Sequence, residues 1–167
     1  SGPEELCNGI SQIAFILKSR VGKKLRPIDC LDIMNIIGSV VVAGNVRRSA
    51  QLALGDQDDV QFLEAKNWSL GSIPNWRAMS NNTIYADSYD HVLEEVWKNG
   101  YEINKDSGYA NGEPYGFFNL PLSQKFGRIK DGPISENLLY PTDVDNCEMT
   151  NPCAEISLAN YECCNLA

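Results

Sequence analysis

The stretch PIDCLDIMNIIGSVVVAGNVRRSAQLALG, residues 27–55, decides the fold class because a helix pattern in it leads directly to a strand pattern. Apolar residues recur at helical spacing after Pro27, which suits a first helical turn, and Gly44-Asn45 suits the end of the helix. The run from Ser49 to Leu54 then alternates polar and apolar residues, which is typical of a strand. Helices that alternate with single strands predict an α/β fold with parallel pairing.

Outward from this stretch the alternation continues in both directions. Residues 3–19 carry an amphipathic helical stripe, and Cys30 is expected inside the second helix as a small buried side chain. The remaining predictions are a short helix through Val60 to Leu63, an ordered surface loop over 67–82, a strand at 84–86, a helix over 90–100, a turn at 111–114, a buried strand over 115–120, a basic turn-rich segment at 127–132 and a loop over 133–144.

The charge balance and the lack of long apolar runs exclude several classes of function. The 167 residues hold 14 basic and 22 acidic side chains, a net charge of −8, with a pI of about 4.6. This acidic balance argues against a general nucleic-acid or anionic-membrane binder. No apolar run approaches the roughly 20 residues that span a bilayer, and the start SGPEEL lacks signal-peptide features, so a cytoplasmic protein is expected.

Four of the six cysteines lie in the last 21 residues, in and before the run TNPCAEISLANYECCNL at 150–166. Asn151, Cys153 and Glu155 are spaced two apart, so in extended backbone all three would face one ligand. This concentration favours redox or catalytic use over a disulfide scaffold. An end just after a cysteine pair and an apolar Asn-Leu-Ala further suggests that the 167 residues are a segment of a larger protein.

A zinc site and a thiolate hydrolase are the two alternative interpretations of the cysteines. Structural zinc sites usually pair ligands two to four residues apart, whereas the gaps between Cys147, Cys153, Cys163 and Cys164 are five, nine and zero residues, so no metal site is predicted. A thiolate hydrolase needs a base near its nucleophile, and His91, the single histidine, lies on a predicted helix. A carboxylate two residues away also disfavours a thiolate, so the pattern suits a neutral thiol or a sulfur radical better.

Four segments in order resemble the large catalytic chain of ribonucleotide reductases: AGNVRRSAQLALG at 43–55, MSNNT at 79–83, NGEPYGFFNLPLSQKFGRIKDG at 111–132, and the cysteine run. The match is closest to the class II, adenosylcobalamin-dependent group, and within it to the monomeric ribonucleoside-triphosphate reductases. It covers essentially the whole chain. The resemblance implies that residues 1–167 form a single partial domain of a ten-stranded α/β barrel, with a finger-loop cysteine near the C-terminus.

The resemblance also implies roles. Cys153 would become a thiyl radical that removes the 3′ hydrogen of the ribose, Glu155 would act as general base at the 3′ hydroxyl, and Asn151 would bind the ribose hydroxyls. Cys164 would be one member of a reducing cysteine pair whose partner lies on an upstream strand that these residues do not contain. Cys163, where related chains often carry proline, would be a competitor for oxidation or a bystander.

Asn45, Arg47 and Arg48 precede the first strand and could offer amides and guanidinium groups to phosphates. In the family this region follows the loop that relays effector identity, so a substrate- or nucleotide-facing role is implied. The alternative is a helix C-terminus stabilised by two arginines.

The leading hypothesis is therefore part of a thiyl-radical ribonucleotide reductase, inactive until completed by further polypeptide. The resemblance implies adenosylcobalamin, although no cobalamin-binding motif is visible in the chain. It also implies a ribonucleoside tri- or diphosphate substrate, a deoxynucleotide effector and a thioredoxin-type reductant, with no nucleic-acid or membrane partner. The alternatives are a non-catalytic nucleotide-binding or interaction module that keeps the barrel sequence, and a thiol redox protein that uses Cys163 and Cys164.

Overall fold

The computed structural model describes residues 3–43, 50–87, 113–114, 116–126 and 145–164. They form a mixture of helices and strands, as the sequence predicts. The helices are α1 (Glu4–Ser19), α2 (Pro27–Ala43), α3 (Val60–Leu63) and α6 (Leu120–Phe126), with 3-10 helices η1 (Trp68–Leu70) and η2 (Asn75–Met79); the strands are β1 (Gln51–Asp56), β2 (Ser80–Tyr85), β3 (Gly116–Phe118), β4 (Met149–Thr150) and β5 (Ser157–Leu158).

Three of the strands form one parallel sheet in the order β1-β2-β3. Its register sets Leu52 beside Asn81 and Leu54 beside Thr83, so these four side chains share one face of the sheet. The predicted parallel pairing is confirmed. The strand predicted over 49–54 is found at Gln51–Asp56, displaced by two residues.

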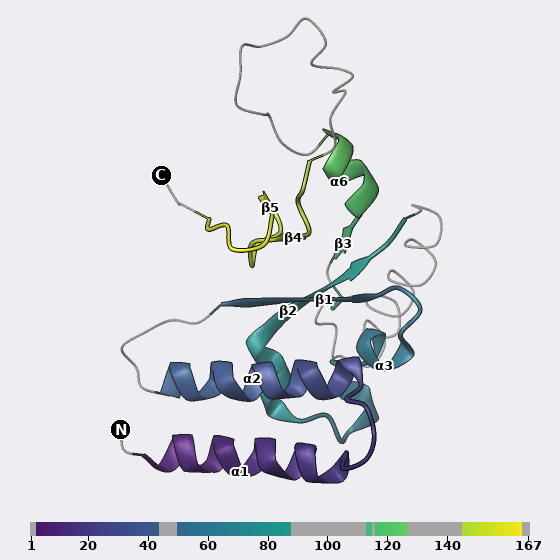
Figure 1. Cartoon of the computed structure of the whole chain (residues 1–167). Helices are drawn as coiled ribbons and strands as arrows, with labels where there is room; N and C mark the ends of the chain where they lie inside the picture. Colours follow the sequence, from purple (N-terminus) through teal and green to yellow (C-terminus); the bar gives the residue numbers. More distant parts are fainter. Residues whose placement is uncertain (1–2, 44–49, 88–112, 115, 127–144, 165–167) are drawn as a thin grey trace, which may run out of the picture.

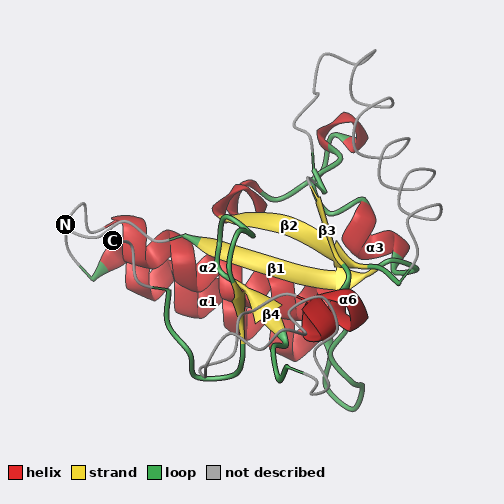
Figure 2. Cartoon of the chain, turned by 90° about the horizontal axis from the view of Figure 1, so that it is seen from above, coloured by secondary structure: helices red, strands yellow, loops and turns green. Residues whose placement is uncertain are grey.

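The sheet lies between two layers. In Figure 1, α2 runs along one side of β1 and β2, with α1 packed beside α2, while the β4–β5 hairpin lies on the other side. Figure 2 views the same arrangement from above, with β1 and β2 crossing in front of α2. The core between α2, α3 and the sheet consists of Ile28, Leu31, Phe62, Leu63, Ala65, Ile84 and Ala86.

A close approach of α3 to β1 requires glycine at one position. A Cβ at Gly55 would come within 2.2 Å of the Phe62 ring, whereas glycine leaves room for this buried side chain. Asp59 is the N-cap of α3, because its carboxylate accepts hydrogen bonds from the amides of Gln61 and Phe62. The short helix predicted through Val60 to Leu63 is confirmed.

The N-terminus of α2 is fixed by charge. Asp29 accepts hydrogen bonds from the Arg26 amide (2.8 Å) and guanidinium (2.7 and 3.0 Å), and its carboxylate lies 3.2 Å from Arg20 Nε. The hydrogen bond from Arg26 lowers the pKa of the Asp29 carboxyl below its usual value of 3.8. An acidic group in the first turn also favours the helix through its dipole.

Helix α1 confirms the predicted helix but not the burial of its stripe. Leu6, Ile10 and Leu17 are exposed, and Gly9 is the buried position, against Val40 of α2. Ile13 and Ala14 of the stripe are half-buried, so the described residues cover the stripe only in part.

Three other predictions are corrected. Cys30 is exposed, because it lines an open cavity between α2 and β1 that the core does not fill. The loop predicted over 67–82 contains η1, η2 and the first half of β2, whose polar residues Ser80 and Asn82 are buried and hydrogen-bonded to each other. The strand predicted over 115–120 is shorter, since α6 begins at Leu120.

The predicted helix over 90–100, residues 111–112 of the predicted turn, and the segments 127–132 and 133–144 lie outside the described residues. No helix within the described ranges combines the length and apolar character needed to cross a bilayer.

Candidate functional site

The candidate site is a tight loop at the tip of the β4–β5 hairpin. Strand β4 pairs antiparallel with β5, with Thr150 opposite Ser157, and the chain reverses between them through residues 151–156, here called the NPCAEI loop. The Asn151 amide donates to the Ile156 carbonyl at 3.1 Å, and the Ala154 amide donates to the Asn151 carbonyl at 2.9 Å. Ala154 has a positive φ of 64°, a strained value for a residue with a Cβ.

Asn151 holds this loop from inside. Its side chain is 4% exposed, and its Oδ1 accepts hydrogen bonds from the amides of Glu155 at 3.1 Å and Ile156 at 3.0 Å. Its Nδ2 donates to Sγ of Cys164 at 3.6 Å. One buried amide therefore ties the loop to a cysteine thirteen positions further along the chain.

Cys153 and Glu155 are exposed, whereas Asn151 is buried. The expectation that all three side chains project to one face of an extended strand is wrong, because the segment turns at Ala154. The turn instead separates a structural group inside the loop from a thiol and a carboxylate at its surface. Cys164 is half-buried beside Asn151.

Two residues of β2 anchor the hairpin on the sheet. Asn81 Nδ2 donates to the Pro152 carbonyl at 2.9 Å, and the Tyr85 hydroxyl donates to the Glu148 carbonyl at 2.7 Å. Burial, with a smaller effect of the Glu148 carboxylate, raises the pKa of the Tyr85 hydroxyl above 10.0, so it remains a donor at neutral pH. Asn81 sits next to the loop residue that precedes Cys153.

Sequence reasoning missed these two anchors. Asn81 lies in the MSNNT segment, whose resemblance to the family implies no role for any single residue. Tyr85 lies in the short strand predicted at 84–86, again without a role of its own. If the whole run from Ser80 to Tyr85 is taken as one strand, Asn81 and Tyr85 fall on the same face of the sheet, because alternate residues of a strand project to the same side.

The segment before β4 is fixed by helix α6. The Asp145 amide donates to the Gln124 carbonyl at 2.7 Å, and Gln124 Nε2 donates to the Cys147 carbonyl at 3.1 Å. Cys147 itself is fully buried. This cysteine is therefore a packing residue, while Cys153 and Cys163 are exposed.

The arrangement offers three chemical groups around one loop: an accessible thiol, an accessible carboxylate and a half-buried second thiol held by an amide. An exposed carboxylate can accept a proton, and thiols can exchange hydrogen atoms or electrons. Within the described ranges, no three His, Cys, Asp or Glu side chains gather as a metal site would require. Asn45, Arg47, Arg48 and His91 lie outside the described residues.

Sequence comparison confirms the predicted resemblance. The chain is 44% identical over 166 residues to the adenosylcobalamin-dependent ribonucleoside-triphosphate reductase of Lactobacillus acidophilus and 44% identical over 168 residues to that of Lactobacillus gasseri. It is 42% identical over 167 residues to the enzyme of that name from Lactobacillus leichmannii. Each match covers 99% of this chain but 20% of the relative, so the chain corresponds to one segment of these proteins.

No family model matches the chain. No solved structure matches it either.

Proposed function

We propose that this chain, a homologue of one segment of adenosylcobalamin-dependent ribonucleoside-triphosphate reductases, is part of the catalytic barrel of such an enzyme and carries its radical loop. The parallel β1-β2-β3 sheet would be one part of the ten-stranded barrel, and the NPCAEI loop would be its finger loop. The complete enzyme would reduce ribonucleotides to deoxyribonucleotides. Because the chain spans 20% of its relatives, it would need the remaining polypeptide to be active.

Each proposed role matches the chemistry of its side chain. Cys153, exposed at the loop surface, would remove the 3′ hydrogen atom of the ribose as a thiyl radical. Glu155 would accept the proton of the 3′ hydroxyl, since it is an accessible carboxylate two residues away. Asn151 would fix the distance between these groups through its bonds to the Glu155 and Ile156 amides, besides any contact with the ribose.

Cys164 would supply electrons. As the 2′ hydroxyl leaves as water, Cys164 and an upstream cysteine of the complete enzyme would lose two electrons and become a disulfide. A thioredoxin-type dithiol would then reduce that disulfide. The hydrogen bond from Asn151 Nδ2 to the Cys164 sulfur, at 3.6 Å, supports this role, because Cys164 lies beside the loop that would bear the radical.

The cofactor would be adenosylcobalamin, which generates the radical when bound. The described residues do not fit a cobalamin themselves: three cavities that they form measure about 320 to 500 Å³, and none of the three is lined by Asn151, Cys153, Glu155 or Cys164. The remaining polypeptide would therefore bind the cofactor.

The substrate would be a ribonucleoside triphosphate or diphosphate, with a deoxynucleotide as effector. Asn45, Arg47 and Arg48, immediately before β1, would face phosphate through amide and guanidinium donors. The chain's net charge of −8 gives no general attraction for anions, so such binding would depend on these local groups.

The observation that carries the proposal is the contact of Asn151 with Cys164, together with the match over 99% of the chain. The test uses a chimera in which the 167 residues replace the matching segment of a related reductase. The chimera should form deoxyribonucleotides from ribonucleotides in the presence of adenosylcobalamin and a dithiol.

Cys153→Ser in the chimera should abolish turnover, by at least about 1,000-fold, because a hydroxyl does not form the required radical, while nucleotide binding stays within about twofold. Cys7→Ser, on the distant helix α1, is the matched control and should leave turnover unchanged. Turnover by the Cys153→Ser chimera would defeat the proposal.

A further inference from the structure

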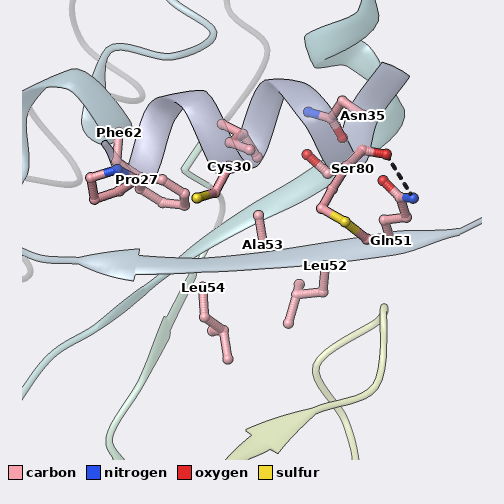
Figure 3. A pocket seen from close by; sticks show the side chains of 11 residues that line it. Pro27, Cys30, Asn35, Gln51, Leu52, Ala53, Leu54, Phe62 and Ser80 are labelled. Carbon is pink, nitrogen blue, oxygen red and sulfur yellow. Dashed lines mark hydrogen bonds between the residues drawn. The ribbon is translucent and has the colours of Figure 1, made fainter. Parts of the chain in front are cut away.

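The two faces of the parallel sheet carry different groups of residues. Figure 3 shows Ala53 of β1 pointing toward α2, whereas Leu52 and Leu54 point to the opposite side, where the pale yellow hairpin lies. Leu52 is paired in register with Asn81 of β2, so the Asn81 side chain also projects to the face that carries the hairpin. Tyr85, further along β2, projects to this face as well.

Asn81 and Tyr85 hold the hairpin at opposite ends of β4. Asn81 Nδ2 donates to the Pro152 carbonyl at 2.9 Å, after the strand, and the Tyr85 hydroxyl donates to the Glu148 carbonyl at 2.7 Å, before it. Four residues of a strand span about 13 Å, so the two hydrogen bonds lie far apart along β2. Both acceptors are backbone carbonyls, so each bond fixes the main chain of the hairpin on the sheet.

The bond from Asn81 acts directly on the backbone of Cys153. The Pro152 carbonyl belongs to the peptide group that ends at the Cys153 Cα, and a peptide group is a rigid plane. Holding its oxygen therefore holds the Cα from which the thiol projects. The bond from Tyr85 holds the peptide group that ends at Met149, and the backbone torsions between Met149 and Cys153 can absorb a displacement there.

Burial does not explain the asparagine at position 81. Its side chain is exposed, whereas its neighbours in β2, Ser80 and Asn82, are buried. A carbonyl oxygen only accepts hydrogen bonds, so the group that faces Pro152 is the NH2 of the amide and not its oxygen. An exposed asparagine that directs its donor at the residue before Cys153 indicates a role in placing the thiol.

We propose that Asn81 is a positioning residue of the reductase: through the Pro152 carbonyl it sets the place of the Cys153 sulfur relative to the ribose. In the proposed step the C3′–H bond of the ribose breaks, an S–H bond forms on the thiyl radical of Cys153, and the unpaired electron passes to C3′. Asn81 gives and takes no atom. Hydrogen transfer requires the reacting atoms to approach to about 3–3.5 Å, so a small displacement of Cys153 slows it strongly. The role of Asn81 rests on the proposed function of Cys153.

Steady-state kinetics of the chimera test the proposal. Asn81→Ala should lower kcat by about 10- to 100-fold, because a displacement of about 1 Å at the reacting atoms costs up to about 100-fold in rate, while KM changes by less than about twofold. Asn81→Asp keeps the shape of the side chain but offers no donor at neutral pH, so it should be as impaired as Asn81→Ala.

Tyr85→Phe is the matched variant, since it removes a hydrogen bond of similar length at the other end of β4. It should lower kcat by less than about threefold, because the lost bond lies far from the thiol. Asn75→Ala, at an exposed asparagine of η2, should leave kcat unchanged. Equal losses of kcat in Asn81→Ala and Tyr85→Phe, or a loss that lies in KM alone, would overturn the proposal.

A deuterium isotope effect shows which step has become slow. A ribonucleotide deuterated at C3′ slows only the hydrogen transfer to Cys153. Asn81→Ala should show the full primary isotope effect of C–H cleavage on kcat, because the transfer then limits turnover, whereas Tyr85→Phe should keep the value of the unmodified chimera. A lower kcat with less than the full effect in Asn81→Ala would place the defect in another step and overturn the proposal.

Hydrogen exchange in the isolated chain gives a readout that does not depend on catalysis. The Ala154 amide donates within the NPCAEI loop at 2.9 Å, and the Glu148 amide donates to a carbonyl of β5 at 2.8 Å, at the other end of the hairpin. Asn81→Ala should speed exchange at least about fivefold at Ala154 and less than about twofold at Glu148. Tyr85→Phe should do the reverse. Equal effects of the two variants at both amides would show that the hairpin moves as one unit, which would overturn the proposal.

Failure of this proposal and failure of the proposed function give different results. An active chimera in which Asn81→Ala keeps full turnover retains the reductase and rejects the role of Asn81. An inactive chimera, together with faster exchange at Ala154 in Asn81→Ala alone, rejects the reductase and retains Asn81 as the residue that holds the loop. If exchange at Ala154 does not change in Asn81→Ala, the proposal fails whatever the chimera does.

Discussion

Asn151 stabilises the NPCAEI loop through one side-chain oxygen, which accepts hydrogen bonds from two backbone amides. These amides belong to Glu155 and Ile156, and they have no strand partner because the chain is turning. A buried hydrogen bond that loses one partner costs about 1–3 kcal/mol. Asn151→Ala should therefore lower the free energy of unfolding by about that amount, measured by urea denaturation, and should speed hydrogen exchange at both amides.

Asn160→Ala provides the control for this prediction, because Asn160 is exposed in the turn after β5. It should change the unfolding free energy by less than about 0.5 kcal/mol. If the two substitutions have equal effects, Asn151 does not hold the loop.

At the residue scale the sequence supplied a hypothesis about the chemistry of the loop but did not predict the orientation of its side chains. The types and spacing of Asn151, Cys153 and Glu155 already indicated sulfur chemistry beside a carboxylate. Their orientation was not predictable, because the positive φ of Ala154 breaks the alternation on which the argument relied. The bond from Asn151 to Cys164 joins residues thirteen positions apart and depends on tertiary structure.

At the scale of helices and strands, a buried aspartate on α2 forms an ion pair and hydrogen bonds with η2. Asp32 accepts hydrogen bonds from Arg77 Nε at 2.6 Å and Nη2 at 2.8 Å, and from Trp76 Nε1 at 3.0 Å. Removing one partner of a buried ion pair costs about 3–5 kcal/mol, because the other charge is left uncompensated. Asp32→Ala should lower the unfolding free energy by that amount, measured by urea denaturation.

The matched acidic control is Glu64→Ala, at the exposed end of α3. This variant should stay within about 0.5 kcal/mol of the unmodified chain. A small effect of Asp32→Ala would mean that apolar packing alone holds η2 against α2.

A second buried ion pair makes stability depend on pH. Glu113 lies 3.0 Å from Lys66 Nζ, and its Oε2 accepts from the Asn82 amide at 2.7 Å. Burial raises the pKa of the Glu113 carboxyl above its usual value of 4.5, outweighing the opposite effects of Lys66 and Asn82. The folded state then holds this proton more tightly than the unfolded state does.

The contribution of Glu113 is therefore fully present below pH 4.5 and is lost as the pH rises through the folded pKa. Glu113→Gln should flatten the dependence of unfolding free energy on pH above 4.5, measured by urea titrations in half-unit steps. Asp29, whose pKa is lowered, acts in the opposite direction and below pH 3.8, so it does not mask the effect. An unchanged slope in Glu113→Gln would contradict the prediction.

Some helices and strands could be predicted from the local sequence pattern alone, and others could not. Helices α1 and α2 follow from apolar periodicity, and β1 from alternation, because these signals are contained within each segment. The length of β2 was missed because SNNT has low strand propensity, and burial of Ser80, Asn82 and Thr83 in the sheet overrides it. Exposure of Cys30 was missed because periodicity does not reveal that an open cavity lies between this part of α2 and β1.

Taken as a whole, the described structure leaves much apolar surface open. Leu6, Ile10 and Leu17 are 51%, 57% and 46% exposed, and at 100° per residue they lie within about 40° of one another around α1. Contiguous apolar surface of this kind is typical of interfaces and promotes association when uncovered. The isolated chain should therefore self-associate at high concentration through this stripe.

Ile10→Lys combined with Leu17→Lys should shift the isolated chain toward monomer, because two charges would have to be buried in any contact made by the stripe. Sedimentation velocity between about 10 and 300 μM measures the effect, and the apparent dissociation constant should rise at least tenfold, which corresponds to about 1.4 kcal/mol. Phe15→Lys changes a residue that is 75% exposed but lies on the opposite side of the same helix, so it should have less than a third of that effect. If Phe15→Lys is as effective as the double variant, association follows total exposed apolar area and the stripe on α1 is not a specific contact surface.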